Sequence, residues 1–254
     1  MSLPRHSREG GNPLGGTALQ IRGSVIHDFG DCWKIQEFAL LNVVRLSCER
    51  DDRLLFSNLS FQLDGGEILQ IEGRNGAGKT SLLRIIVGFS SSLCGDIFWN
   101  NQPLSKVYAD FRLDCFFLGH KPGLKLDLTP LENLIWRAKL ANTIIHREVL
   151  LSALDRAQLT GYEDIPCSHL SAGQLRRVAF ADLIARQARF WILDEPFTAI
   201  DTEGVTWLES LFDEHTHRGG MVLVTSHQPF LSDCQGKLSK LNLEYFTEQS
   251  DTGE

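Results

Sequence analysis

The chain has 254 residues and a mass of 28.5 kDa, which is enough for a sizeable core and excludes a peptide hormone or a mini-scaffold. Hydrophobic residues make up 43% and charged residues 22%, as in globular proteins and unlike a disordered chain or a membrane protein. The formal net charge of -7 repels nucleic acid, and the sequence shows no basic patch to override it, so we expect no nucleic-acid partner.

The cysteines and the hydropathy pattern both indicate a cytoplasmic chain. Six cysteines are scattered without a CxxC pair, which favours reduced thiols over a disulfide framework or a zinc site. No window approaches the roughly 18 to 20 consecutive apolar residues that a membrane-spanning helix requires. The charged start of the chain is followed by no apolar stretch, so a secretory signal is not predicted.

In chain order, the first recognisable pattern begins at Leu40. Residues 1–39 are rich in glycine and have neither a helical nor a strand period, so we expect a poorly ordered extension there. The apolar pattern then predicts two strands, at 41–46 and 56–63, joined by a hairpin. Later elements are predicted as strands at 68–71, 97–99, 115–118, 190–193 and 221–225, a helix at 79–87 and further helices between several strands. This layout is typical of an α/β sheet.

The segment at about 122–172 differs because it predicts helices and no strand. Thr129-Pro130-Leu131-Glu132 is a capping box with proline at the first helical position. A second helix is predicted from about Arg147 and stops before Gly161. We therefore expect a helical insert between strands of the sheet.

A phosphate-binding pattern, GxxxxGK[ST], occupies residues 73–80. Its glycines let backbone N–H groups turn onto phosphate oxygens, Lys79 reaches the β and γ phosphates, and Thr80 places a hydroxyl on Mg²⁺. A glycine-rich turn can match this pattern by accident, but the strand before it and the helix after it favour nucleotide binding. The predicted nucleotide contacts of this loop are Gly73, Arg74, Asn75, Gly76, Ala77, Gly78, Lys79, Thr80 and Ser81.

A second chemical signal is the pair of carboxylates, Asp194 and Glu195, that ends the apolar strand at 190–193. Two solvated acids at a strand end would be the simpler explanation if the segment stood alone. Beside a phosphate loop, Asp194 can hold the metal and Glu195 can orient and deprotonate the attacking water.

A third signal is the segment LSAGQ, which precedes a helix predicted from about Ala172. Taken alone, it fits an ordinary serine N-cap as well as a second anion site at a helix start. The residues concerned are Leu170, Ser171, Ala172, Gly173 and Gln174.

The order of these segments, followed by His227 after the strand at 221–225, resembles the nucleotide-binding domain of ATP-binding cassette (ABC) proteins. The resemblance covers about residues 40–246 and implies a P-loop NTPase fold with a central sheet, a small antiparallel β subdomain and the helical insert, followed by a flexible tail at 247–254. It also implies a head-to-tail dimer of two copies, with LSAGQ of one copy closing over ATP held by the other. Asp201 matches the segment that communicates between subunits.

The resemblance implies that Glu195, His227 and Lys79 carry hydrolysis, with His227 as the switch histidine on the γ phosphate. Two positions depart from the family pattern. Arg50 stands where an aromatic side chain usually meets adenine, and the nearest aromatic is Phe56. Arg50 is therefore expected at the nucleotide, and two alternatives stay open: its guanidinium plane stacks on the base, or adenine is bound more weakly. His120 stands where a glutamine usually senses Mg²⁺ and water, and imidazole can ligate a metal or bond water with a charge that depends on pH. The expected metal site therefore comprises Thr80, Asp194 and His120.

Finer strings, including residues 118–125 and WILDEPFTAID at 191–201, are similar to the ATP-binding subunit of the cytochrome c maturation transporter. That similarity implies an energy-coupling subunit on the cytoplasmic face of the bacterial inner membrane, docked through its helical insert onto a separate membrane permease. Heme export and release of a heme-loaded chaperone both stay open as the coupled event. We expect no direct heme binding, because Cys167-Ser168-His169 adjoins LSAGQ and no heme attachment motif is present.

Three other functions are compatible with parts of this sequence. A transporter subunit for a different cargo would differ only in its membrane partner. A soluble cassette ATPase acting on nucleic acid is disfavoured by the net charge of -7 and by the single cassette. A catalytically silent ATP-binding scaffold is disfavoured because Lys79, Asp194, Glu195 and His227 are all present.

Overall fold

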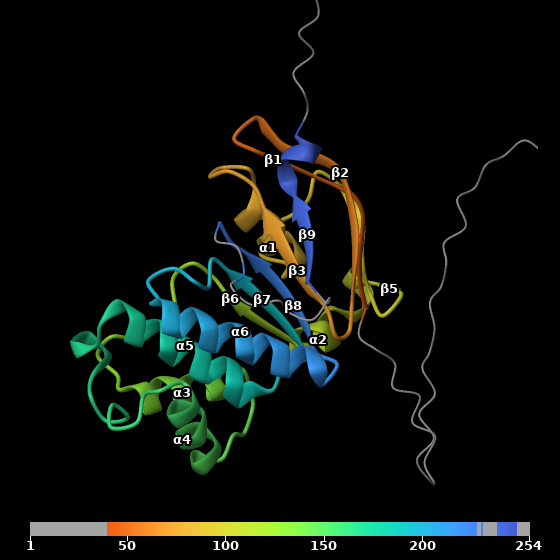
Figure 1. The fold of residues 1–254 in the computed structure, drawn as a ribbon. Coiled ribbons are helices and arrows are strands. Elements are labelled where there is room, and N and C mark those ends of the chain that lie inside the picture. Colours follow the sequence, from red (N-terminus) through yellow and green to blue (C-terminus); the bar gives the residue numbers. More distant parts are fainter. Residues whose placement is uncertain (1–39, 228–229, 231–237, 248–254) are drawn as a thin grey trace, which may run out of the picture. The chain divides into compact units, whose positions relative to one another are not determined.

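The computed structural model describes residues 40–227, 230 and 238–247. The poorly ordered extension expected at 1–39 lies outside the described residues, as does the expected tail apart from residue 247. The described elements form two sheets and six α-helices (Figure 1). Both the α/β class and the separate antiparallel sheet that the resemblance implied are therefore confirmed.

The antiparallel sheet begins with a hairpin of β1 (Leu40–Arg50) and β2 (Arg53–Asp64). Asp51 and Asp52 form its turn with φ of 52° and 57°, as a two-residue turn of the primed type needs. β4 (Cys94–Trp99) pairs with the other edge of β1, and the short β5 (Gln102–Pro103) follows, so the strand order is β2-β1-β4-β5. The predicted hairpin is confirmed.

The second sheet is parallel throughout. Its strands, in spatial order, are β6 (Cys115–Leu118), β7 (Phe190–Asp194), β8 (Met221–Thr225), β3 (Ile68–Glu72) and β9 (Leu238–Asn242). Every residue of β7 and β8 is buried, because helices or the other sheet cover both faces. Since the carboxyl ends of parallel strands meet at one edge, the segments after β3, β7 and β8 come together there.

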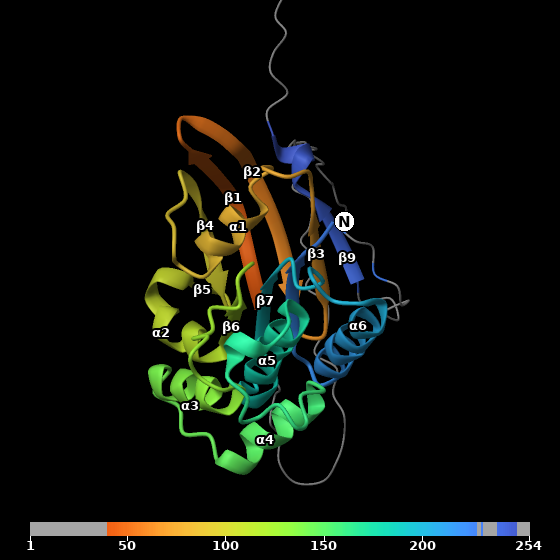
Figure 2. The same cartoon turned by 90° about the vertical axis from the view of Figure 1, so that its left-hand side faces the viewer.

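Two cores lie on opposite faces of the parallel sheet, and β7 shows how the sequence divides between them. Phe190 and Ile192 face the first core, with the antiparallel sheet, α1 (Lys79–Ile86) and α2 (Leu104–Asp114). Trp191 and Leu193 face the second core, with α5 (Ala172–Arg186) and α6 (Thr202–His217). In Figure 2, the antiparallel strands β1 and β2 and helix α1 lie in the upper part of the view, and α5 and α6 lie in the lower part.

The helical insert comprises α3 (Pro130–Leu140), α4 (Arg147–Arg156) and a short 3-10 turn (Cys167–His169). Residues 122–172, all of which the structure describes, contain no strand, as predicted. The capping box is confirmed: the Glu132 backbone N donates to Thr129 Oγ1 at 3.2 Å, and the Thr129 backbone N donates to Glu132 Oε2 at 2.9 Å. A third core joins α3 and α4 to α5, so α5 contacts both the insert and the sheet (Figure 1).

Within the ranges that the structure describes, no helix combines the length and apolarity needed to cross a bilayer. The four described cysteines, Cys48, Cys94, Cys115 and Cys167, are free thiols.

Candidate functional site

The phosphate loop connects β3 to α1 and has a shape that only glycine adopts without strain. Gly73, Gly76 and Gly78 have φ of 144°, 82° and 99°. At Gly78 an added Cβ would lie 3.1 Å from both Leu55 Cβ and Phe56 Cδ1, because β2 presses on the loop. The N–H groups at the start of α1 face the same region, where an anion would be stabilised.

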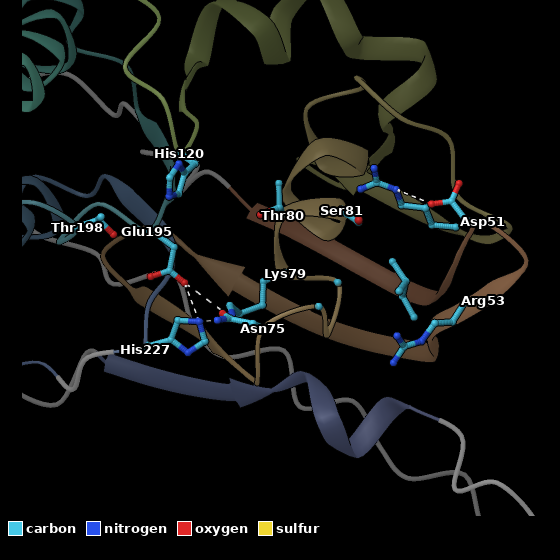
Figure 3. A pocket seen from close by; sticks show the side chains of 14 residues that line it. Asp51, Arg53, Asn75, Lys79, Thr80, Ser81, His120, Glu195, Thr198 and His227 are labelled. Carbon is cyan, nitrogen blue, oxygen red and sulfur yellow. Dashed lines mark hydrogen bonds and ion pairs between the residues drawn. The ribbon is translucent and has the colours of Figure 1, made fainter.

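A pocket of about 630 Å³ opens over this loop (Figure 3). Its lining residues are Arg50, Asp51, Arg53, Leu55, Asn75, Gly76, Gly78, Lys79, Thr80, Ser81, His120, Glu195, Thr198 and His227. Ten of these positions were predicted from the sequence, and they come from five separate segments. Gly73, Arg74 and Ala77 belong to the loop without lining the pocket, and Asp194 lies buried beneath it.

Lys79 lies at the centre of the charged end of the pocket. Its Nζ donates to the carbonyl oxygens of Gly73 at 2.6 Å and Arg74 at 3.3 Å. The same nitrogen lies 2.9 Å from His227 Nε2 and 3.9 Å from Glu195 Oε1. Burial lowers the pKa of Lys79, and the nearby carboxylate of Glu195 opposes that shift. The ammonium therefore sits where phosphate oxygens could replace its carbonyl partners.

The three residues expected to carry hydrolysis lie together. His227 Nε2 is 3.3 Å from Glu195 Oε1, so the imidazole, the Lys79 ammonium and the carboxylate adjoin one another (Figure 3). Glu195 has an unusual backbone for a non-glycine residue, with φ of 50°, a conformation that costs about 1 to 3 kcal/mol. Its backbone N donates to Thr225, at 3.2 Å to the carbonyl and 2.9 Å to Oγ1. That contact helps hold the carboxylate at the pocket wall.

A hydroxyl and a carboxylate meet beneath the loop. Thr80 Oγ1 donates to Asp194 Oδ2 at 2.9 Å, and Thr225 Oγ1 donates to Asp194 Oδ1 at 2.8 Å. Such hard oxygen donors fit Mg²⁺, which keeps some of its ligands as water or substrate phosphate. His120, the third expected ligand, is exposed on the loop after β6 and lies beside Glu195 in Figure 3. In the described part of the chain, no three His, Cys, Asp or Glu side chains cluster as a metal site.

Thr225 was not predicted as a site residue. The strand register places it directly opposite Asp194, since these residues are Cα partners in the β7–β8 pair. Nothing in the local sequence marks it, because a threonine at a strand end is ordinary. Only knowledge of which strands are neighbours could have identified it.

The end of the pocket expected to meet the base has no aromatic lining. Phe56 is fully buried against Gly78, so the nearest aromatic residue is unavailable for stacking. Arg50, Arg53 and Leu55 line this end instead, and the Arg50 side chain is 71% exposed with Nε 3.5 Å from Asp51 Oδ2.

The LSAGQ segment begins α5 and lies outside the pocket. The Gln174 backbone N donates to Ser171 Oγ at 3.2 Å, and the Ser171 backbone N donates to Gln174 Oε1 at 2.8 Å. The serine N-cap is therefore confirmed, and Ser171 stays exposed. Asp201 likewise caps α6, where its Oδ1 accepts from the Gly204 backbone N at 2.9 Å. Within one copy, neither LSAGQ nor Asp201 reaches the nucleotide pocket.

Comparisons with known proteins agree with this geometry. The family model described as ABC transporter matches residues 56–198. The chain is similar to the cytochrome c biogenesis ATP-binding export protein CcmA of Escherichia coli O6:H1, with 48% identity over 80% of this chain and 96% of the relative. The protein of the same name from Vibrio cholerae serotype O1 is 45% identical over 80% of this chain and 98% of the relative.

Solved structures show the same fold. The cbiO1 subunit from Clostridium perfringens, part of the ABC transporter complex cbiONQ, matches with a TM-score of 0.63 and 25% identity over 74% of this chain and 78% of that one. A dimeric bacterial ABC transporter cassette matches with a TM-score of 0.70 and 21% identity, over 80% of this chain and 94% of that one.

Proposed function

Because this chain belongs to the ABC transporter family, as a relative of the cytochrome c biogenesis ATP-binding export proteins, we propose that it hydrolyses ATP to drive a transporter complex for c-type cytochrome biogenesis. One observation carries the catalytic part of this proposal: Lys79, Glu195 and His227 meet beside the phosphate loop, within 3.9 Å of one another at the atoms described. The cassette is proposed to span residues 40–246.

The proposed chemistry follows from the positions of these groups. The loop N–H groups and Lys79 bind the phosphates, and Glu195 accepts a proton from the attacking water. His227 contacts the γ phosphate. Thr80 and Asp194 would hold Mg²⁺, with His120 as a further ligand or a partner of the water; the chemistry supplied there is neutralisation of phosphate charge.

The dimer belongs to the same proposal. Ser171 is exposed at the start of α5 and does not line its own pocket, so it is available to the nucleotide of a second copy. Two copies placed head to tail would each complete the other's site through Leu170–Gln174, with Asp201 near the junction. A bacterial ABC transporter cassette of similar fold is itself dimeric.

The membrane partner is the finer part of the proposal. The relatives are named as export proteins of cytochrome c biogenesis, and export across a membrane requires a permease, so a permease subunit of that system is the proposed partner. We place the complex at the cytoplasmic face of the inner membrane, with α3 and α4 of the insert towards the permease. Its coupled event is heme export or release of a heme-loaded chaperone.

The dimer is tested with Glu195→Gln, which keeps the shape of the side chain but removes its basicity. We expect this variant to bind ATP without hydrolysing it and to elute as a dimer in size-exclusion chromatography with ATP. Glu148→Gln, on the exposed first turn of α4, is the matched control and should stay active and monomeric. A Glu195→Gln protein that binds ATP and remains monomeric would contradict the dimer.

The pathway is tested by affinity purification of the tagged chain from detergent-solubilised host membranes, followed by mass spectrometry. Recovery of a membrane subunit of the cytochrome c maturation system is the expected result. Recovery of an unrelated permease would be compatible with the proposed ATP hydrolysis but would contradict the assignment to cytochrome c biogenesis.

A further inference from the structure

Arg176 is a buried cation that the proposed chemistry does not use. It lies on the second turn of α5 and is 3% exposed. Its guanidinium donates to five backbone carbonyl oxygens: those of Gly119 at 3.4 Å, His120 at 2.8 Å, Asp194 at 3.1 Å, Glu195 at 2.7 Å and Pro196 at 3.3 Å. A guanidinium has five N–H donors in a rigid plane, so these contacts satisfy it without a carboxylate partner.

The five contacts divide between two segments. Nη1 faces the loop after β6, which carries His120, whereas Nε and Nη2 face the turn after β7, which carries Glu195. The planar group therefore sets the separation of two backbone segments that no strand pairing joins at this point. Burial lowers the pKa of Arg176 to about 10, so the group remains charged at neutral pH.

Arg176 also completes the support of the Glu195 backbone. Thr225 accepts from the Glu195 N–H on one side, and Arg176 donates to the Glu195 carbonyl on the other. Both ends of a residue in the left-handed region, with φ of 50°, are thereby held. The Thr198 backbone N also donates to this carbonyl, at 3.2 Å, and Arg176 adds the shorter, charged contact at 2.7 Å.

From this geometry we propose that Arg176 is a positioning residue for hydrolysis: it holds Glu195 and His120 in register across the pocket and ties both to the helix that begins with LSAGQ. This inference rests on the proposed ATPase function. In the proposed dimer, LSAGQ at the start of α5 contacts the nucleotide of the second copy. Arg176, one helical turn further along α5, would transmit this contact to Glu195 in the pocket of its own copy.

Arg186 provides a matched control, because it is also an arginine of α5 with buried partners. Its Nε donates to Asp182 Oδ1 at 2.9 Å and its Nη2 donates to the Arg137 carbonyl at 3.0 Å. The bond to Asp182 lies within α5, the bond to Arg137 ties α5 to α3, and neither touches the pocket. If Arg176 acts only through the packing of α5, substitution of Arg176 and substitution of Arg186 should therefore lower kcat to a similar extent.

The experiment compares Arg176→Met, Arg176→Lys and Arg186→Met with the wild-type chain. Each is assayed for kcat, for the affinity of a fluorescent ATP analogue, and for folding by circular dichroism. We expect both Arg176 variants to lose about 10- to 100-fold in kcat, the scale of a misplaced catalytic group. Nucleotide affinity should change less than about threefold, because the phosphate loop is intact. Lysine should not rescue activity, since an ammonium cannot bridge both segments.

A second readout does not need hydrolysis. The imidazole NMR signals of His120, assigned by their loss in His120→Gln, should shift in Arg176→Lys and stay in place in Arg186→Met. If Arg176→Met fails to fold, Arg176→Lys decides the question. A folded Arg176→Lys with wild-type kcat and unshifted His120 signals would overturn the positioning role. A wild-type chain without ATPase activity would overturn the proposed function, while the NMR comparison would still decide whether Arg176 positions His120.

Discussion

At the scale of single residues, charged and polar groups at the ends of β7 and β8 are held by partners from other segments. Asp194 is fixed by Thr80 and Thr225, and the Glu195 backbone by Thr225 and Arg176. Lys79 and Asp194 could be found from the sequence because each belongs to a local pattern of fixed spacing. Thr225 and Arg176 could not, since their roles depend on strand register and on helix packing between residues distant in the chain.

Lys79→Ala is predicted to abolish ATP turnover. The ammonium is the one described cation with contacts to the phosphate loop, His227 and Glu195 together, so its removal takes away the charge that would meet the phosphates. We expect kcat/KM to fall by about 100-fold or more, the scale seen when one preorganised electrostatic group is lost. A steady-state phosphate-release assay measures this change.

Lys106→Ala, on the exposed face of α2, is the control for Lys79→Ala and should retain wild-type turnover. Turnover by Lys79→Ala within about twofold of the wild type would show that another group supplies the phosphate contact.

At the scale of elements, the sequence is most informative where local signals and tertiary contacts agree. The capping box at Thr129 starts α3 as predicted, and the apolar runs of β7 and β8 become buried parallel strands. β9 was not predicted: its residues Leu238–Asn242 are only partly buried, and its place beside β3 comes from strand pairing rather than from an apolar run. The edge strand thus lacked the hydrophobic signal that revealed the central ones.

The contact between α6 and β7 is predicted to make stability depend on pH. The His215 ring stacks on Trp191 with centroids 3.6 Å apart and an interplanar angle of 7°, and its Nε2 lies 3.1 Å from the Arg189 carbonyl. Burial lowers the pKa of His215 from 6.5 to about 4. Between these pH values the unfolded chain therefore binds a proton more readily than the folded one. The contribution of the neutral, buried His215 to the free energy of unfolding is present above pH 6.5 and is lost as the pH falls towards 4.

His215→Phe keeps a ring on Trp191 but cannot take up a proton. The free energy of unfolding is measured with urea at about pH 7 and about pH 5. We expect it to drop less from the higher to the lower pH in the variant than in the wild type. Ser210→Ala, also on α6 and exposed, changes no titratable group and is the control, which should leave the pH dependence as it was. Equal losses in the wild type and His215→Phe would remove His215 as the cause.

At the scale of the whole described molecule, two sheets of different kinds meet at the phosphate loop. The antiparallel hairpin places Phe56 and Leu55 against Gly78, while the parallel sheet supplies Asp194 and Glu195 from below. The pocket is therefore assembled from both sheets. The α/β class followed from strand and helix patterns, whereas the separate antiparallel sheet was implied by the family resemblance. The close contact of the hairpin with the phosphate loop could not be predicted from the sequence. It joins residues more than 20 positions apart, and no sequence motif marks it.

The hydrogen bonds of Lys79 have a consequence for the kinetics of ATP binding. Its ammonium is bound to the Gly73 carbonyl at 2.6 Å and adjoins His227 Nε2 at 2.9 Å, so phosphate must displace these partners. Capture then has two successive stages, an encounter whose speed rises with ATP concentration and a rearrangement whose speed does not. In stopped-flow mixing, the observed rate should rise and then level off at high ATP. His227→Ala, which removes one of these partners, should raise that plateau. A strictly linear rise in the wild-type chain would contradict the exchange.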